Sequence, residues 1–316
     1  MSETGKVFFI DANQYLNLYR VTTGKQLLAP LQEHQEYLFV TEQIVQEVER
    51  NKLQVAAEFL AKQFEQLKVS SFGVPDHLFD ISEELEAKLR EQLGEIGDKI
   101  KETNKQLMNA ANETLRQISQ STDRVSKSLD TIFKRAVRPT QEELQKARER
   151  KERGNPPGKS ENPLGDQLTW EQILTQCQQW SQLWIVTNDG DYATLHNSEL
   201  LLNPFLYKEL LQRNPKLEIY CFKKLLAGLQ HFTKTIGADL NKQITPADIE
   251  EIKKEEESLL PLGWIPQARH EPVLWHHYYR NWHPAYYTSA SAGLPIMLGW
   301  TANSTLTPEP NDPEKR

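Results

Sequence analysis

Apolar runs of strand type alternate with helical patterns in two separate parts of the chain. Residues 7–10 and 37–40 are short apolar runs, and a helical pattern that begins after Thr41 follows the second run. The same alternation returns later in the chain. We expect helices at residues 166–180 and 204–213, strands at residues 183–187 and 217–222, and a final helix through about residue 233. Strands that alternate with helices predict an α/β fold, with a doubly wound parallel sheet flanked by helices.

The segment between these two parts has a helical pattern throughout. No proline occurs between Pro75 and Pro139, and apolar residues recur at helical spacing. A single helix of this length would span on the order of 90 Å at 1.5 Å per residue, so we expect an antiparallel helical hairpin that turns at residues 119–123. Such a hairpin is either an arm that clamps substrate or pairs with a second subunit, or a cap packed on the sheet domain, and the pattern favours neither.

These patterns divide the chain into four segments. We expect the two halves of a sheet domain at residues 1–75 and 154–236, a helical insertion at 76–153, and a C-terminal extension at 237–316. The extension opens with an acidic helix and continues as an aromatic-rich tail from Gly263 to Trp300, for which core packing is favoured over a surface that stacks unpaired bases. The histidine spacing of the tail fits no zinc site. The last ten or so residues are expected to be disordered.

Composition and charge narrow the class of protein. The chain of 316 residues is 38% hydrophobic, which permits a core, and no stretch approaches the roughly 20 apolar residues of a membrane span. Because no basic and apolar leader opens the chain, we expect a cytoplasmic protein without a membrane partner. The net charge of −7 argues against a protein that coats nucleic acid, although residues 131–160 carry nine basic and four acidic side chains. A solvated helix face is the favoured interpretation of this basic bias, and a phosphate-binding surface is the alternative.

Four acidic residues stand where the expected sheet would bring them together. Asp11 ends the first strand, and Glu47 lies in the helix after the second. Asp166 opens the helix that follows a Pro- and Gly-rich linker, and Asp189 follows the strand at residues 183–187. In open α/β sheets the ligand crevice lies outside the carboxyl ends of the strands. Carboxylates gathered there could hold Mg²⁺ or Mn²⁺ for phosphodiester hydrolysis, whereas each acid taken alone is more often a helix cap.

Other enzyme classes fit the sequence less well. A phosphatase of the haloacid-dehalogenase kind also begins with a strand that ends in Asp, but it needs a second Asp two residues later, where this chain has Asn13. The chain also has no Walker loop, dinucleotide fingerprint or Gly-x-Ser-x-Gly elbow. The acidic metal site therefore remains the favoured hypothesis.

The segments that carry these acids resemble the PIN-domain nucleases, in particular a PIN-like subfamily with a helical insertion before the third acidic residue. The matching pieces are residues 8–13, 41–48, 155–166 and 185–192. The resemblance assigns both catalysis and metal binding to Asp11, Glu47, Asp166 and Asp189, with Asp191 as a further metal ligand. It also gives Asn13 and Thr187 the role of orienting these ligands.

Three basic residues lie close in sequence to the acidic positions. Lys6, Arg50 and Lys52 are candidates for contact with substrate phosphates. For each one taken singly, a role in surface solubility is the favoured alternative.

The resemblance implies a PIN-type endoribonuclease that depends on Mg²⁺ or Mn²⁺ and cuts single-stranded or structured RNA. It leaves open the choice between RNA and DNA and the biological role, which in relatives is that of a toxin, a defence effector or an RNA-processing factor. An antitoxin-like partner stays unidentified, and the helical insertion is a candidate homodimer contact. The alternative is a catalytically inactive PIN-like module that binds RNA or protein through the insertion and the tail.

Overall fold

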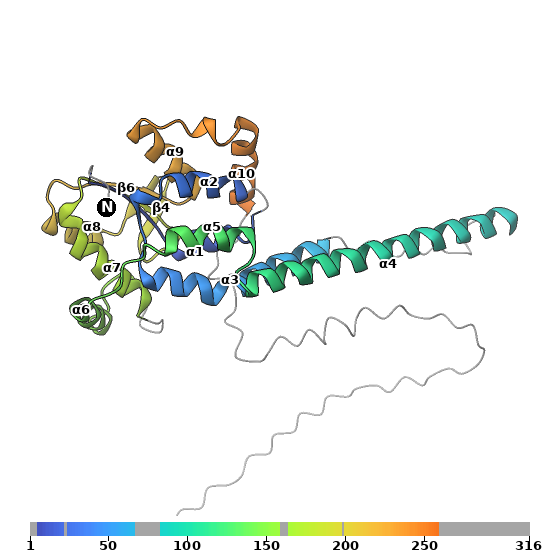
Figure 1. Cartoon of the computed structure of the whole chain (residues 1–316), viewed down its shortest axis with the longest axis horizontal. Coiled ribbons are helices and arrows are strands. Elements are labelled where there is room, and N and C mark those ends of the chain that lie inside the picture. The colour runs from blue at the N-terminus through green and yellow to red at the C-terminus, as the bar shows by residue number, and fades with distance from the viewer. Residues whose placement is uncertain (1–4, 22–23, 67–82, 159–163, 198, 259–316) are drawn as a thin grey trace, which may run out of the picture. The chain divides into compact units, whose positions relative to one another are not determined.

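The computed structural model describes residues 5–21, 24–66, 83–158, 164–197 and 199–258 (Figure 1). A four-stranded sheet is formed by β1 (Lys6–Ile10), β2 (Leu38–Phe39), β3 (Gln182–Val186) and β6 (Glu218–Phe222). The strands lie in the order β2-β1-β3-β6, and each neighbouring pair is parallel. This topology confirms the predicted parallel α/β sheet.

The helices around the sheet follow the strands in the expected alternation. They are α1 (Ala12–Asn17), α2 (Lys25–Glu33), α3 (Glu42–Gln66), α7 (Gly165–Gln176), α8 (Pro204–Arg213) and α9 (Leu225–Ile236), with 3₁₀ turns η1 (Gln35–Tyr37), η3 (Cys177–Gln179) and η4 (Leu240–Lys242). α3 begins as expected, because the hydroxyl of Thr41 accepts a hydrogen bond from the Ile44 N–H at 3.3 Å and so caps the helix. The sequence pattern did not predict the antiparallel hairpin of β4 (Ala193–His196) and β5 (Glu199–Leu202).

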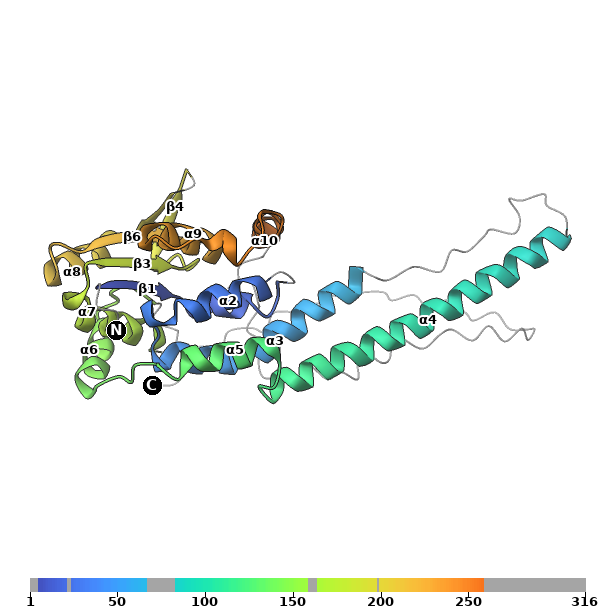
Figure 2. The same cartoon turned by 45° about the horizontal axis from the view of Figure 1, so that its top comes forward.

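The register of the sheet sets its strand ends side by side. Ile10 pairs with Val186, and Val186 pairs in turn with Phe222. Figure 2 shows β1 and β3 pointing in the same direction. Because the strands are parallel, Asp11 and Thr187, which follow β1 and β3, both lie at the carboxyl edge of the sheet, where the carboxyl ends of its strands lie together.

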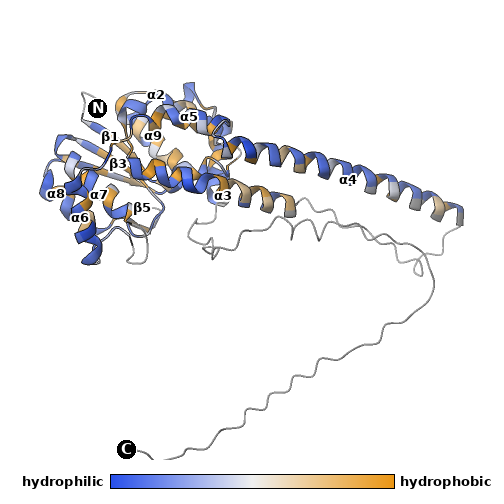
Figure 3. Cartoon of the chain, turned by 60° about the horizontal axis from the view of Figure 1, so that its bottom comes forward, coloured by the Kyte–Doolittle hydropathy of each residue, from blue (hydrophilic) through white to orange (hydrophobic). Residues whose placement is uncertain are grey.

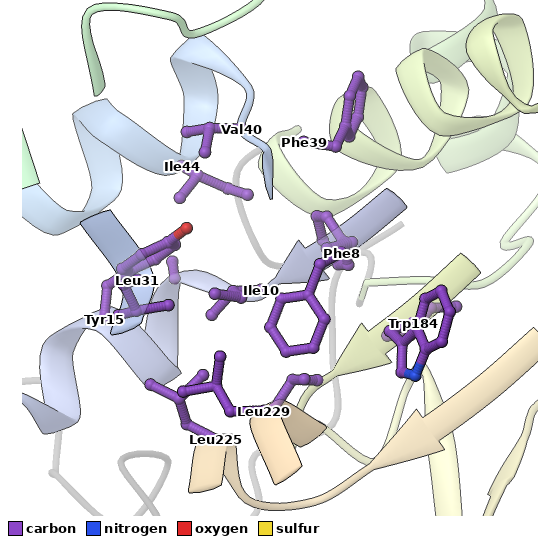
Figure 4. Close-up of a cluster of buried hydrophobic side chains, with 14 of the residues drawn as sticks. Phe8, Ile10, Tyr15, Leu31, Phe39, Val40, Ile44, Trp184, Leu225 and Leu229 are labelled. Carbon is purple, nitrogen blue, oxygen red and sulfur yellow. The ribbon is translucent and has the colours of Figure 1, made fainter. Parts of the chain in front are cut away.

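Successive residues of β1 supply the two faces of the sheet. Phe8 points to α9, where its ring centroid lies 5.1 Å from that of Phe232. Phe9 points to the other face, against the ring of Tyr192, which also contacts Trp170 of α7. Figure 4 shows the side chains around Phe8, and all five of these rings are buried. The two faces therefore share one continuous core across the central strand.

The helical insertion contains α4 (Glu83–Ser119), α5 (Arg124–Phe133) and α6 (Gln141–Glu152). The turn lies where it was expected, and Asp123 caps α5 by accepting a hydrogen bond from the Ser126 N–H at 2.9 Å. The expected pairing of two helices within the insertion is wrong. α4 packs against α3, and the much shorter α5 packs against α2. Figure 3 shows that α4 is mainly hydrophilic. Its exposed large apolar side chains are Leu85, Leu93, Ile96 and Leu107.

Two of the features that tie the insertion to the sheet domain are a backbone contact at Val137 and a buried guanidinium. The Val137 N–H donates to the Val40 carbonyl at 2.9 Å, and the Glu42 N–H donates to the Val137 carbonyl at 3.0 Å. These bonds place a piece of the insertion beside the end of β2, the strand at one edge of the sheet.

The second feature is a buried guanidinium. Arg150 of α6 donates to Glu171 of α7 at 2.7 Å, to Glu209 of α8 at 2.8 Å and to the Pro156 carbonyl at 2.6 Å. Glu209 also accepts a hydrogen bond from the indole N–H of Trp170 at 2.9 Å. One arginine thus connects the insertion to two helices of the sheet domain.

In the extension, η4 is followed by α10 (Pro246–Ser258), close to the predicted acidic helix. Glu256 of α10 accepts a hydrogen bond from the Leu226 N–H of α9 at 3.3 Å. The aromatic tail from Gly263 to Trp300 and the last ten residues, predicted to be disordered, lie outside the described residues. Within the described ranges, no helix combines the length and apolar character needed to cross a membrane.

Candidate active site

Asp11 and Asp189 are joined through one hydroxyl at the carboxyl edge of the sheet. The carboxylate of Asp11 does not cap α1, and it accepts a hydrogen bond from Thr187 Oγ1 at 2.9 Å. The same oxygen of Thr187 accepts from the Asp189 N–H at 3.0 Å. The Asp11 N–H donates to the Val186 carbonyl at 3.0 Å, which continues the strand ladder to the site. Thr187 therefore fixes the positions of two acids from neighbouring strands.

The loop after Asp189 is tightened by its own side chain. The carboxylate of Asp189 accepts a hydrogen bond from the Asp191 N–H at 2.9 Å. The next residue, Tyr192, is buried, and its hydroxyl donates to the Asp166 carbonyl at 3.4 Å. The loop at the end of β3 is thereby connected to the first turn of α7.

Glu47 and Asp166 come from two helices that approach each other closely. The start of α7 lies against α3, where a Cβ atom on Gly165 would lie 2.6 Å from the side-chain nitrogen of Gln43. Gln43 and Glu47 are four residues apart and share one face of α3. Asp166 opens α7 without capping it, because the cap position is Leu164. The two acids therefore face a common space.

Burial and mutual repulsion raise the pKa values of the Asp11, Glu47 and Asp166 carboxyls. The pKa of Asp11 is raised to about 7, first by burial and then by the charges of Glu47 and Asp189. Burial also raises the pKa of Glu47 to about 7, with repulsion from Asp166 and Asp189. The pKa of Asp166 is raised to about 7 by burial and by the charges of Asp11 and Asp189. Acids from β1, α3, α7 and the loop after β3 thus form one electrostatic group.

A model of the family described as a PIN-like domain matches residues 7–199, which is more than half of the chain and includes all four acids. The chain belongs to the PIN-like domain family. The match runs through the helical insertion, so these helices lie within the matched range of the PIN-like domain. Comparisons with curated proteins and with solved structures gave no match.

The carboxylates of the PIN-like domain suit a divalent cation by their chemistry. Carboxylate oxygens are the ligands that Mg²⁺ and Mn²⁺ prefer, and a cation relieves repulsion of the kind found among Asp11, Glu47 and Asp166. In the part of the chain that the structure describes, no group of three or more His, Cys, Asp or Glu side chains is arranged to hold one ion. Mg²⁺ commonly keeps several waters and one or two carboxylates, so the residues fit an ion held in that way.

Asp191, Asn13 and Arg50, which were also predicted as site residues of the PIN-like domain, differ in burial and in their effect on the acids. Asp191 raises the pKa of Asp166 and so belongs to the electrostatic group. Asn13 is half-buried in the first turn of α1. Arg50 is exposed, and its charge lowers the pKa of Glu47 against the effect of burial.

The structure corrects the expectation for two basic residues of the PIN-like domain. Lys6 opens β1, so it lies at the opposite end of the strand from Asp11, and its ammonium donates to the Thr235 carbonyl at 3.3 Å. Lys52 is only 3% exposed. Its ammonium donates to Glu49 at 2.8 Å and to Ser121 at 2.6 Å. Lys52 therefore holds the turn between α4 and α5, and neither lysine is placed to contact substrate.

Sequence reasoning missed two contributors to the site. Tyr192 brings its buried ring up to all four acids, whose charges add to the effect of burial in raising its pKa well above the ordinary value. Gly165 allows the contact between α3 and α7. The glycine directly before Asp166 was a usable signal for close approach, whereas Tyr192 stood in the matching piece 185–192 without a role assigned to it.

Proposed function

We propose that this PIN-like domain is a metal-dependent endoribonuclease that hydrolyses phosphodiester bonds at Asp11, Glu47, Asp166 and Asp189, with Mg²⁺ or Mn²⁺ as its cofactor. The observation that carries the proposal is the electrostatic coupling of acids from four separate elements at the carboxyl edge of the sheet. Structural acids are normally paired with cations or hydrogen-bond donors, and a group of acids that raise one another's pKa is typical of a functional site.

The residues of the chain have separate tasks in this proposal. A divalent cation, when bound, would supply an activated water and neutralise charge that develops on the phosphate. Asp11 and Asp189, held by the Thr187 hydroxyl, would hold the ion together with Glu47 and Asp166. Asp191 strengthens the negative field around Asp166. We assign to Arg50, three residues after Glu47 and exposed, a contact with a phosphate of the substrate.

A cleavage assay tests the proposal. The full chain is incubated with labelled single-stranded RNA or DNA of mixed sequence, in Mg²⁺, Mn²⁺ or EDTA, beside an Asp11→Asn variant. We expect RNA to be cut internally with either metal, and neither EDTA nor the variant to support cleavage. Cleavage that persists in EDTA or in Asp11→Asn would falsify the metal mechanism.

A catalytically inactive PIN-like module that binds RNA or protein is the second candidate. It is favoured by one observation, that the described residues hold no group of three or more ligating side chains arranged around one ion. Calorimetric titration of the full chain with Mn²⁺ separates the two candidates. The enzyme requires metal binding that Asp11→Asn weakens, whereas the inactive module predicts the same weak binding in both proteins.

A further inference from the structure

A row of basic side chains covers the outer face of α5 and the segment after it. Residues 124–138 contain five basic residues and one acidic residue, a local net charge of five minus one, or +4, in a chain whose net charge is −7. The basic residues, all exposed, are Arg124, Lys127, Lys134, Arg135 and Arg138. They are called the α5 basic row below.

The geometry of the helix separates the α5 basic row from the core. At 100° per residue, the basic residues of α5 fall on one side of the helix, and its buried residues fall on the opposite side. The buried residues are Ser126, Leu129 and Ile132. The inner face thus anchors α5 to the domain and leaves the basic side chains in solvent.

Most of this charge is not neutralised by neighbouring side chains. The single acid, Asp130, pairs with Lys134 at 2.6 Å. Arg138 is 86% exposed on its side chain and only approaches Glu42, at 3.8 Å. Across the described ranges, no ion pair joins Arg124, Lys127 or Arg135 to an acidic side chain. The row is therefore open to an external anion.

The segment that carries the α5 basic row lies alongside the first turns of α3, the helix that carries Glu47. At the start of α5, Ser126 lies 3.3 Å from the ammonium of Lys52 on α3. Beyond its end, Val137 is bonded to Glu42, the first residue of α3. α5 thus runs in the opposite direction to α3. Glu47 lies between these two fixed points, roughly 7.5 Å along the helix axis from Glu42.

We propose that the α5 basic row binds the sugar-phosphate backbone of single-stranded RNA and leads it to the four carboxylates. This inference rests on the proposed nuclease function, because it describes the substrate path of the same site. A chain with a net charge of −7 repels a polyanion over most of its surface, so an unneutralised row that runs along α3, the helix that carries Glu47, is where the backbone can approach. Such contacts release counterions and are sensitive to salt.

The test measures binding in EDTA, so that hydrolysis is not required. The full chain, a row variant (Lys127→Gln, Arg135→Gln and Arg138→Gln) and a control variant are titrated with a labelled single-stranded RNA of mixed sequence at several salt concentrations. The control carries Lys208→Gln, Arg213→Gln and Lys216→Gln, which are exposed residues of α8 and of the segment between α8 and β6. Both variants lose three positive charges, and thermal melting checks that each is folded.

We expect the row variant to bind about 10-fold or more weakly and to lose about 2 from the slope of log K against log salt, since each phosphate contact in a single strand contributes about 0.7. The control should keep the slope of the unmodified chain. Equal losses in the two variants, no loss in the row variant, or no RNA binding by the unmodified chain each overturn the proposal.

Cleavage assays with Mg²⁺ separate this inference from the proposed function. Row-dependent binding without cleavage leaves the α5 basic row in place and counts against the nuclease. Cleavage by the row variant with an unchanged KM supports the nuclease and overturns the row as its substrate path. Tighter row-dependent binding of single-stranded DNA than of RNA overturns the assignment to RNA.

Discussion

At the scale of single residues, the hydroxyl of Thr187 positions two acidic residues at once. It donates to Asp11 in a buried hydrogen bond and accepts from the Asp189 backbone in a part-buried one. Its own backbone N–H donates to the Phe222 carbonyl at 3.0 Å, so its position is set by the sheet. A residue that touches no substrate thus determines where two acids lie.

Replacing Thr187 by Val keeps the shape of the side chain and removes only the hydroxyl. We expect metal-dependent cleavage to fall by about 10- to 100-fold, because groups that orient metal ligands typically contribute that much. Thr187→Ser retains the hydroxyl and should keep most of the activity. The measurement is the cleavage rate as a function of Mn²⁺ concentration, and a Val variant with full activity at every concentration would contradict this role.

The raised carboxyl pKa values predict how the metal-free protein responds to pH. The pKa of Asp11 is about 7 in the folded chain and about 4 when unfolded, so its ionisation opposes folding. The contribution of Asp11 to folding stability is therefore most favourable below pH 4, falls as the pH rises towards 7, and stays reduced above pH 7.

Asp11→Asn should therefore stabilise the metal-free protein at pH 8 and not at pH 4. The variant keeps an oxygen that can accept from Thr187 and removes a buried charge that repels Glu47 and Asp189. We expect a gain of about 1–4 kcal/mol in the free energy of unfolding at pH 8, measured with urea in EDTA. If the variant is less stable than the unmodified chain at pH 8, the electrostatic account of the site is wrong.

At the scale of elements, α9 packs against the sheet through a glycine. A Cβ atom on Gly228 would lie 2.7 Å from a methyl group of Val186 and 3.2 Å from the ring of Phe8. Both neighbours are buried core residues, and the β-branched Val186 has little rotameric freedom. The glycine therefore sets the distance between helix and sheet.

Gly228→Ala should lower the free energy of unfolding by about 1–3 kcal/mol, because overpacking outweighs the gain in helix propensity. Gly94→Ala is the matched control. Gly94 lies within α4, and a Cβ atom there would meet nothing within 4 Å, so we expect a gain of about 0.5–1 kcal/mol. Urea unfolding of both variants measures the two effects, and equal changes would refute the packing argument.

The contacts of Arg150 join α6, α7 and α8 in a buried ionic network. Arg150→Met should destabilise the chain by about 3–5 kcal/mol, because it leaves the carboxylates of Glu171 and Glu209 without their partner. Adding Glu171→Gln and Glu209→Gln removes those charges and should restore much of the loss. Urea unfolding measures the free energy of unfolding of both variants. A triple variant no more stable than Arg150→Met would contradict the role of the unpaired carboxylates.

At the scale of the whole molecule, the sequence predicts the parallel sheet and its acidic edge. The alternation of strands and helices was readable because the strands are short apolar runs, and parallel pairing then brings Asp11 and Asp189 to the same edge. The packing partners of helices were not readable. Apolar spacing indicates that α4 has a buried face and does not indicate whether α3 or α5 covers it.

Closeness in sequence was a poor guide to the basic residues of the site. Lys52 follows Glu47 by five residues, which on a helix turns it roughly 140° away and towards Ser121, far along the chain. Lys6 precedes Asp11 by five residues, which on a strand is roughly 16 Å. Arg50 follows Glu47 by three residues and stays near its face of α3.

The stability of the whole chain should depend on the divalent cation. At pH 8, Mn²⁺ at 100 times its dissociation constant should raise the free energy of unfolding by about 2.7 kcal/mol. The gain should shrink at pH 5, because protons compete for carboxyls whose pKa is about 7. Thermal melting with and without Mn²⁺ measures both effects, and a gain that is the same in Asp11→Asn would place the ion elsewhere.

The anchoring of Val137 beside the end of β2 limits how the insertion can be shortened. Deleting the whole insertion would leave the Val40 carbonyl and the Glu42 N–H without the hydrogen bonds that they make to Val137, and it would leave Glu171 and Glu209 without Arg150. The first part of α4, by contrast, keeps several large apolar side chains in solvent. Shorter natural or engineered forms of this chain should therefore lose length from α4 and retain α5, Val137 and α6.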